Sequence, residues 1–467
     1  MKIKPKDIAV TSENPFAEDL LGRKAEIENL SPILSSIDGP LVLTIDSPWG
    51  TGKTTFIKLW RAFLESEGIA SIYFNAWESD YADDPLVALV SELDKWVMSL
   101  DESGDSKGVW KQAKSLLPGV AKSTAVAAAK IATFGGLDIE KEYEKVAADL
   151  AGGVANDLVD SFNIQSEAIS SFKNKIEQTL SLLGETQKNI IVFVDELDRC
   201  RPTYAIELLE RIKHLFNIER LVFVLSTDID QLSHSVRAVY GNDFDSRKYL
   251  QRFIDLDYSL KKPENKSYIE SSFNSLAINS HFSERREGRY ELEHLIECCD
   301  VLAGRFQLSL RDINLLATRV RLILLSIPSN HYLDEPLIVS LLILREKNPE
   351  LYSRYVSDPS VADEVIDFIG SGLSDEVVYS FAFCLMSGFL IAPNMRIADG
   401  NRFKELLAPY EKVTAAEDSQ HNDRWYAADK IIHISKGTRD MGRIMNHKTT
   451  VERIELLHRI NIELNND

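Results

Sequence analysis

The sequence predicts an α/β protein in which a mostly parallel sheet is followed by an all-helical C-terminal region. In the first part of the chain, short apolar runs alternate with helical patterns, which is typical of a parallel sheet with helices on both faces. The predicted strands are residues 41–45, 71–75, 190–194, 221–225 and 253–258. After Pro263 the sequence pattern changes, and the apolar residues mostly follow helical spacing.

Helical patterns also define the organisation of the chain. Residues 100–186 separate the second strand from the third and are too long for a plain connection, so we expect a helical insertion there. The C-terminal helices are expected at residues 268–277, 291–302, 310–327, 336–346, 361–370, 375–390 and 451–464. We therefore divide the chain into a core over 1–262, a helical lid over 263–330 and a helical domain of unknown role over 331–467.

Composition and charge restrict the classes of function. The chain of 467 residues carries a net charge of −19, which disfavours non-specific binding to nucleic acid. Its four cysteines lack Cys-x-x-Cys spacing, so neither a disulfide framework nor a zinc site is expected. No signal-peptide pattern opens the chain, and Lys122 and Lys130 interrupt its most apolar long stretch. We expect a cytoplasmic protein without a membrane span.

The most informative motif follows the first predicted strand, as Asp-Ser-Pro-Trp-Gly-Thr-Gly-Lys-Thr-Thr at residues 46–55. A strand, this loop and a helical pattern form the setting that a P-loop, or Walker A motif, requires. Gly50 and Gly52 let backbone N–H groups turn toward an anion, and Lys53 reaches the β- and γ-phosphates of a nucleotide. Ser47 stands where the motif usually has its first glycine. The predicted nucleotide-binding residues of the loop are Pro48, Trp49, Gly50, Thr51, Gly52, Lys53, Thr54 and Thr55.

Three acids follow the apolar run at residues 190–194, which has the continuous hydrophobicity of a strand buried on both faces. Asp195 takes the place of a Walker B aspartate, and we expect it to bind Mg²⁺ together with Thr54. Glu196 is placed to polarise a water molecule for attack on the γ-phosphate. Asp198 either supports these two acids or caps the next helix. With the loop, these residues predict a P-loop NTPase core that binds ATP and Mg²⁺.

With these motifs in order, the chain resembles the KAP P-loop NTPases, a branch near the STAND and AAA+ ATPases. Beside the two nucleotide motifs, the resemblance rests on Asp-Leu-Leu-Gly-Arg at residues 19–23 and Tyr-Phe-Asn-Ala-Trp at 73–77. Tyr-Leu-Gln-Arg-Phe-Ile at 249–254 is similar to a strand-entry motif of the family, and Ser-Leu-Arg-Asp-Ile at 309–313 resembles the start of its lid helix. The chain departs from the family at Glu196, where a second aspartate is frequent, and its insertion lacks the apolar helices of membrane-anchored relatives.

The resemblance implies roles for residues outside the two main motifs. Gly22 and Arg23 are expected to border the adenine or the ribose. Thr227 is expected to act as a sensor that hydrogen-bonds the γ-phosphate or the attacking water. Arg252 and Arg311 are candidates for an arginine finger and a lid sensor, which stabilise the charge of the transition state. The alternative for each arginine is a simple ion pair with one of the many acids of the chain.

Three functions from different classes fit these features. The first is an ATP-hydrolysing switch that changes its conformation or assembly, with a role in bacterial anti-phage defence implied by the resemblance. The second is an assembly scaffold that nucleotide stabilises and in which hydrolysis is slow or incidental. The third, an ATPase that acts on nucleic acid, is disfavoured by the net charge. ATP is favoured over GTP because no guanine-reading Asn/Thr-Lys-x-Asp motif follows the fourth strand. The expected partners are further copies of the chain, an effector protein, or both.

Overall fold

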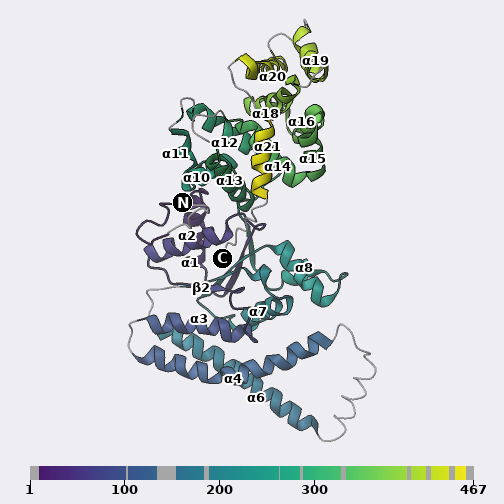
Figure 1. Ribbon diagram of the computed structural model, residues 1–467. Helices are drawn as coiled ribbons and strands as arrows, with labels where there is room; N and C mark the ends of the chain where they lie inside the picture. The colour runs from purple at the N-terminus through teal and green to yellow at the C-terminus, as the bar shows by residue number, and fades with distance from the viewer. Residues whose placement is uncertain are drawn as a thin grey trace. The chain divides into compact units, whose positions relative to one another are not determined.

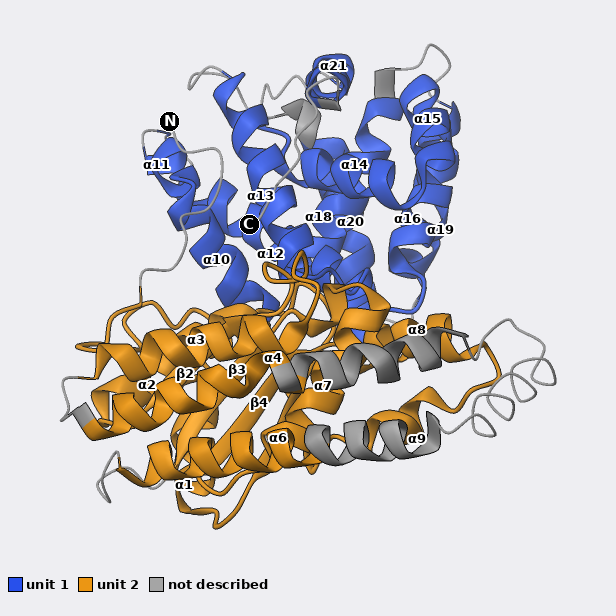
Figure 2. Ribbon diagram, turned by 90° about the horizontal axis from the view of Figure 1, so that it is seen from below, with its two compact units in different colours: residues 1–7, 263–467 blue, residues 8–262 orange. Residues whose placement is uncertain are grey.

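A computed structural model describes residues 10–100, 104–133, 154–182, 189–261, 263–283, 285, 288–327, 333–396, 401–416, 422–440 and 447–458. The chain forms two compact units (Figure 2). One unit spans residues 8–262, and the other consists mainly of residues 263–467. The division of the second unit into a lid and a further domain near residue 330 stays a prediction.

The first unit is built on a five-stranded parallel sheet with the strand order β2-β3-β4-β1-β5. Its strands are β1 (Leu41–Asp46), β2 (Ser71–Asn75), β3 (Ile190–Asp195), β4 (Leu221–Thr227) and β5 (Leu256–Ser259). The parallel sheet is therefore confirmed. The fifth strand begins later than predicted, because Phe253 closes a turn by donating its N–H to the Leu250 carbonyl. The side chain of Phe253 is buried in the core. Its apolar character therefore reflects packing in the core and does not indicate the start of a strand.

Helices cover both faces of this sheet, as the alternation of patterns predicted (Figure 1). Ile190, Val192 and Val194 of β3 lie in one hydrophobic cluster, and Ile191 and Phe193 lie in the other. Because successive side chains of a strand point to opposite faces, a strand buried on both sides is apolar throughout. The helices of this layer arrangement are α1 (Lys24–Ser36), α2 (Lys53–Ser66), α3 (Pro85–Ser99), α7 (Pro202–Leu215), α8 (Ile229–Tyr240) and α9 (Ser246–Leu250).

The insertion between β2 and β3 is helical in its described part. It consists of α4 (Gly104–Thr133) and α6 (Val154–Leu182), which lie side by side (Figure 1). Trp110 and Phe172 anchor the two helices in the hydrophobic cluster that also contains α3. Residues 134–153 lie outside the described ranges. They include most of residues 147–154, where the spacing of apolar residues also predicts a helix, and the charged residues at 138–142, which argue against a membrane span. Within those ranges, no helix combines the length and the low charge that crossing a membrane requires.

The second unit is helical, which confirms the predicted C-terminal region. The helix predicted over 375–390 is divided into α17 (Asp375–Val378) and α18 (Phe381–Ile391), since Ser380 caps the second by accepting the N–H of Phe383. Four described helices were not predicted, and they span Ile278–Ser283, Pro349–Ser357, Asn401–Ala415 and Asp423–Asp440. The helices of the unit are α10 (Asn265–Ser275), α11 (Ile278–Ser283), α12 (Gly288–Arg305), α13 (Leu310–Leu325), α14 (Glu335–Lys347), α15 (Pro349–Ser357), α16 (Ala362–Gly370), α17, α18, α19 (Asn401–Ala415), α20 (Asp423–Asp440) and α21 (His447–His458).

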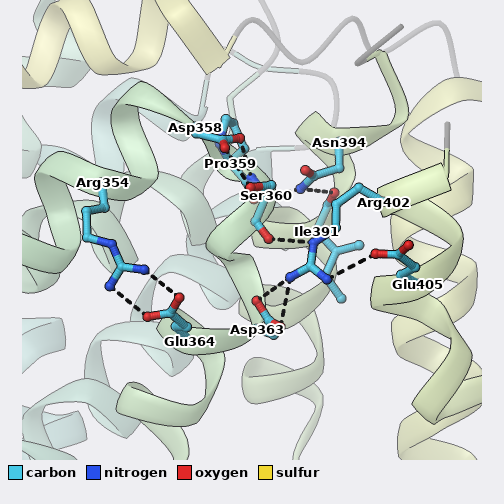
Figure 3. A network of polar contacts seen from close by, with 10 residues as sticks. All are labelled: Arg354, Asp358, Pro359, Ser360, Asp363, Glu364, Ile391, Asn394, Arg402 and Glu405. Atoms are coloured by element: carbon cyan, nitrogen blue, oxygen red, sulfur yellow. Dashed lines mark hydrogen bonds and ion pairs between the residues drawn. The ribbon is translucent and has the colours of Figure 1, made fainter. Parts of the chain in front are cut away.

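A polar network fixes the turn between α15 and α16 (Figure 3). Arg402 of α19 donates to the Ser360 carbonyl at 2.9 Å and to both carboxylate oxygens of Asp363. The buried amide of Asn394 donates to the Pro359 carbonyl at 2.8 Å. Both donors therefore bind the same turn from a distant part of the chain. We infer that this network holds the helical unit together and is not a ligand site.

Asn189 provides a test of the contacts that hold the sheet to α1. Its buried side-chain amide donates to the Leu34 carbonyl at 2.7 Å and to the Ile37 carbonyl at 2.9 Å. We expect Asn189→Ala to lower the free energy of unfolding of this unit by about 2 kcal/mol, because two carbonyls lose their donor. Urea denaturation followed by circular dichroism measures the loss. The exposed Asn217 is the matched control. Losses of equal size at the two positions would contradict the assignment.

Candidate functional site

The P-loop connects β1, which ends at Asp46, to α2, which begins at Lys53. Gly50 and Gly52 have φ angles of 74° and 90°, in the left-handed region that favours glycine. Ser47, in the place of the usual first glycine, has no such φ angle, and its hydroxyl donates to the Thr51 Oγ1 at 2.7 Å. The departure from the motif is therefore accommodated by a side-chain hydrogen bond within the loop.

The Lys53 ammonium turns back over this loop. It donates to the Ser47 carbonyl and, at 3.3 Å, to the Pro48 carbonyl. Burial lowers the pKa of Lys53 below its ordinary value, and nearby carboxylates act in the opposite direction. These carboxylates belong to Asp198, Asp228, Asp195 and Asp46. The lysine thus lies between the loop and a group of acids, a setting suited to phosphates together with a divalent cation.

Asp195 is the last residue of β3 and is only 1% exposed. One carboxylate oxygen accepts the Tyr73 hydroxyl at 3.2 Å, and the other accepts the Glu196 N–H at 3.0 Å. Burial raises the pKa of Tyr73, so the phenol stays protonated and acts as the donor. Among the described residues, no group of three or more His, Cys, Asp or Glu side chains could hold a metal alone. Asp195 with Thr54 fits Mg²⁺, which keeps several waters and phosphate oxygens as ligands.

Glu196 follows Asp195 in a left-handed backbone conformation, with a φ angle of 61°. Such strain in a residue other than glycine persists only where the surroundings impose it, and it is frequent at functional sites. The carboxylate pairs with the Arg199 guanidinium at 2.9 Å, and Arg199 lies over the ring of Trp77. Burial raises the pKa of Glu196, while Arg199 and a hydrogen bond from Asn75 counteract the rise. A raised pKa makes the carboxylate a stronger base.

Asp198 lies in the short 3-10 helix over Leu197–Arg199 and is buried. Its carboxylate accepts the indole N–H of Trp49, whose side chain is otherwise 48% exposed. The next helix, α7, has no side-chain cap. Of the two alternatives for Asp198, the helix cap is not observed, and the contact with Trp49 joins Asp198 to the P-loop, which was not predicted. Its role in catalysis stays a prediction.

Thr227 ends β4, the strand that lies between β1 and β3. Its backbone carbonyl accepts the Ser47 N–H at 3.3 Å, so it lies next to the P-loop. The side chain is fully buried, and its hydroxyl has no hydrogen-bond partner among the described residues. A buried hydroxyl without a partner costs free energy, and a bound phosphate or water would satisfy it. This feature fits a ligand at the P-loop.

Gly22 and Arg23 connect the N-terminal segment to the end of the sheet. Gly22 has a φ angle of 64°, and Arg23 is 1% exposed. The guanidinium donates to Glu26 at 2.8 Å and to the Lys261 carbonyl at 2.7 Å, beyond β5. Its other two nitrogens have no partner within the described part of the chain. Arg23 is thus anchored in this unit, and its contact with adenine or ribose stays a prediction.

The two candidate arginines differ in position. Arg252 is exposed above the ring of Tyr249, in the turn before β5. This turn lies at the amino-terminal end of the sheet, since the Asp255 N–H donates to the carbonyl of Val42, near the start of β1. The P-loop follows the other end of β1, so the fold does not bring Arg252 to its own P-loop. Arg311 is exposed in the first turn of α13, in the second unit.

Several contacts of this site were not foreseen from the sequence. They are the pairing of Arg199 with Glu196, the bond from Tyr73 to Asp195 and the bond from Trp49 to Asp198. Asn75 and Trp77 were noticed only as part of the motif at residues 73–77. Knowledge of the strand order would have placed β2 beside β3. It would therefore have placed this motif beside the three acids.

Comparisons with known proteins agree with this site. Residues 23–326 match the family described as KAP family P-loop domain. The phage T7 exclusion protein of Escherichia coli (strain K12) is 21% identical over 283 residues, which are 59% of this chain and 36% of that protein. The chain therefore spans only about a third of the length of this relative.

Solved structures that the comparison matches to this chain include ORC2 of Aeropyrum pernix, at 11% identity and a TM-score of 0.35, over 91% of this chain and 98% of that chain. DnaA of Aquifex aeolicus matches at 11% identity and a TM-score of 0.26, over 97% of this chain and 96% of that chain. Scores this low carry no argument about function. The family match, in contrast, extends over more than half of the chain and includes both nucleotide motifs. The chain belongs to the KAP family of P-loop domains.

Proposed function

We propose that this protein binds ATP with Mg²⁺ and hydrolyses it to drive a change of conformation or assembly. The observation that carries the proposal is the convergence of Lys53, Asp195 and Thr227 at the carboxyl ends of three neighbouring strands. Open α/β sheets bind their ligands at this edge. The family match and the unpartnered hydroxyl of Thr227 support the same site.

We assign the following roles in ATP binding and hydrolysis to residues of this chain. The loop N–H groups and Lys53 bind the phosphates, and Thr54 and Asp195 hold Mg²⁺, which when bound neutralises charge on the phosphate oxygens. Glu196 accepts a proton from a water molecule as the water oxygen attacks the γ-phosphorus. The bond from that phosphorus to the bridging oxygen breaks, and the products are ADP and inorganic phosphate. Thr227 orients the water or the γ-phosphate.

A second candidate is a scaffold that bound nucleotide stabilises, with slow hydrolysis. The pairing of Glu196 with Arg199 favours it, because a carboxylate held by a guanidinium is less able to accept a proton. The two functions differ in turnover. A scaffold binds ATP tightly and releases phosphate slowly, whereas the switch hydrolyses ATP in each cycle.

The biological setting and the partners are part of the proposal. The relative named for phage exclusion supports a role in anti-phage defence. The location that we propose is the bacterial cytoplasm. Arg252 is exposed and distant from its own P-loop, so a role as arginine finger requires a second copy of the chain. The partners that we propose are further copies of the chain, an effector protein, or both. The net charge of −19 speaks against a nucleic acid as partner.

The decisive experiment measures ATP turnover at several protein concentrations, with and without DNA, beside a sizing measurement. We expect the rate per subunit to rise with concentration as the protein assembles, and DNA to have no effect. Tight binding of ATP without turnover would favour the scaffold. A protein that neither binds nor hydrolyses ATP would overturn both candidates.

Arg252→Ala tests whether an arginine is supplied by a second copy. We expect ATP binding to be retained and turnover to fall by about a thousandfold, the effect of losing an arginine finger. Mixing Arg252→Ala with Glu196→Gln should restore part of the turnover, because a mixed assembly contains one complete site. The exposed Lys248 on α9 is the control, as Lys248→Ala should leave turnover unchanged. An active Arg252→Ala variant would contradict the assignment.

A further inference from the structure

A cavity of about 660 Å³ lies beside β2, at the outer edge of the first unit. Its wall includes Lys58 and Arg61 of α2, Ser71 of β2 and Trp96 of α3. None of the P-loop residues, all of which the structure describes, lines it. The volume is in the range of sites for small molecules, which is about 300–1,000 Å³. The cavity is therefore a separate candidate for ligand binding.

Neither cation of this cavity forms an ion pair with a carboxylate in the described part of the chain. Lys58 and Arg61 lie three residues apart on one helix, so they share a face. Lys58 is exposed and forms no ion pair with a described residue. The Nε of Arg61 is buried and has no hydrogen-bond partner in the described part of the chain. Glu65 also lines the cavity and its charge acts on Arg61, although no ion pair joins the two side chains. A buried guanidinium nitrogen without a protein acceptor is satisfied by a bound water or by an anion.

Arg61 also connects the cavity to the nucleotide site. Its guanidinium lies 5.1 Å from the centre of the Tyr73 ring. On the other side, the Tyr73 hydroxyl donates to the Asp195 carboxylate at 3.2 Å. Only two side chains therefore separate the cavity from the carboxylate that is placed to bind Mg²⁺.

We propose that this cavity binds a small organic phosphate, whose phosphoryl group pairs with Arg61 and Lys58 and whose planar part lies against Trp96. The guanidinium fork matches the geometry of phosphate oxygens, and the ammonium adds a second positive charge. Two cations on one helix face suit a dianionic phosphoryl group better than a single carboxylate. The hydroxyl of Ser71 provides a further donor in the wall of the cavity.

Binding in this cavity strengthens the binding of Mg²⁺ and nucleotide, a coupling that rests on the proposed function. The bound phosphate neutralises the charge of Arg61, which lowers the positive potential near the metal. It also makes Tyr73 a weaker donor to Asp195, whose carboxylate is then more available to Mg²⁺. Both effects act in the same direction, and the coupling is reciprocal.

The binding site is tested in the full-length Lys53→Ala variant, in which the P-loop no longer holds phosphate. Calorimetry with phenyl phosphate should detect binding, and Arg61→Gln in this background should weaken it at least about tenfold. Lys58→Gln, at an exposed position, should weaken it less. The control is Lys213→Gln on α7, outside the cavity. No binding, or equal binding after Arg61→Gln and Lys58→Gln, would overturn the proposal.

The planar part of the ligand and the coupling have their own tests. Trp96→Ala should weaken phenyl phosphate but not inorganic phosphate. In the unmodified protein, saturating phenyl phosphate should raise the affinity for ADP-Mg²⁺ about fivefold. Tyr73→Phe keeps the ring under Arg61, so it should bind phenyl phosphate but lose the coupling. If phenyl phosphate raises the affinity for ADP-Mg²⁺ equally in the unmodified protein and in Tyr73→Phe, the coupling does not pass through the Tyr73 hydroxyl. Failure of nucleotide binding alone refutes the proposed function and leaves the calorimetric result standing.

Discussion

Replacing Lys53 with alanine is expected to remove most of the affinity for ATP-Mg²⁺ and to leave the fold intact. The ammonium lies over the P-loop, and it is the only lysine in that loop. A hydrogen bond to a charged group contributes about 1.5–3 kcal/mol, so a loss of about a hundredfold in affinity is expected. The fold should survive, because the Ser47 and Pro48 carbonyls that lose their donor belong to the loop between β1 and α2 and not to a helix or strand.

Calorimetric titration with a non-hydrolysable ATP analogue and Mg²⁺ measures this loss. The control is Lys95→Ala on α3, an exposed lysine that pairs only with Glu92. It should bind the analogue as the parent does. If Lys53→Ala binds with the affinity of the parent, the nucleotide site lies elsewhere. Circular dichroism separates a loss of binding from a loss of structure.

The sequence predicted the buried parts of the fold well, because burial on both faces leaves a continuous apolar run. β3 and β4 show this pattern throughout, and their predicted bounds differ little from the observed ones. β5 pairs only with β1 and is largely exposed, so its apolar content is low and its start was placed at the buried Phe253. The missed helix α11 is short, and α15 follows α14 with a single residue, Asn348, between them.

The candidate site was predictable where one segment carries all its parts. The P-loop and the acids after β3 are each contiguous, so spacing alone suggested their chemistry. The contacts that join segments were not predictable. Tyr73 lies 122 residues from Asp195, and Trp49 lies 149 residues from Asp198. Such contacts depend on the strand order, which places β3 between β2 and β4 and which no local pattern specifies.

Glu196→Gln is expected to separate nucleotide binding from hydrolysis. Loss of a general base typically lowers a rate by about 10²–10⁴-fold, so turnover should fall at least about a hundredfold. The affinity for ATP-Mg²⁺ should remain, because Lys53 and the loop N–H groups do not depend on this carboxylate. Asp195→Asn should differ, since it weakens Mg²⁺ binding and so lowers both affinity and turnover.

The matched control is Glu207→Gln on α7, a glutamate whose pKa burial also raises. Phosphate release and calorimetric affinity should both stay near the values of the parent in this variant. If Glu196→Gln also keeps its turnover, the base must be another acid, and Asp198 is the nearest alternative in the sequence. If the parent itself turns over as slowly as Glu196→Gln, the base is inactive in the isolated protein. The ion pair with Arg199 gives a physical reason for that result, and Arg199→Ala should then raise turnover by freeing the carboxylate.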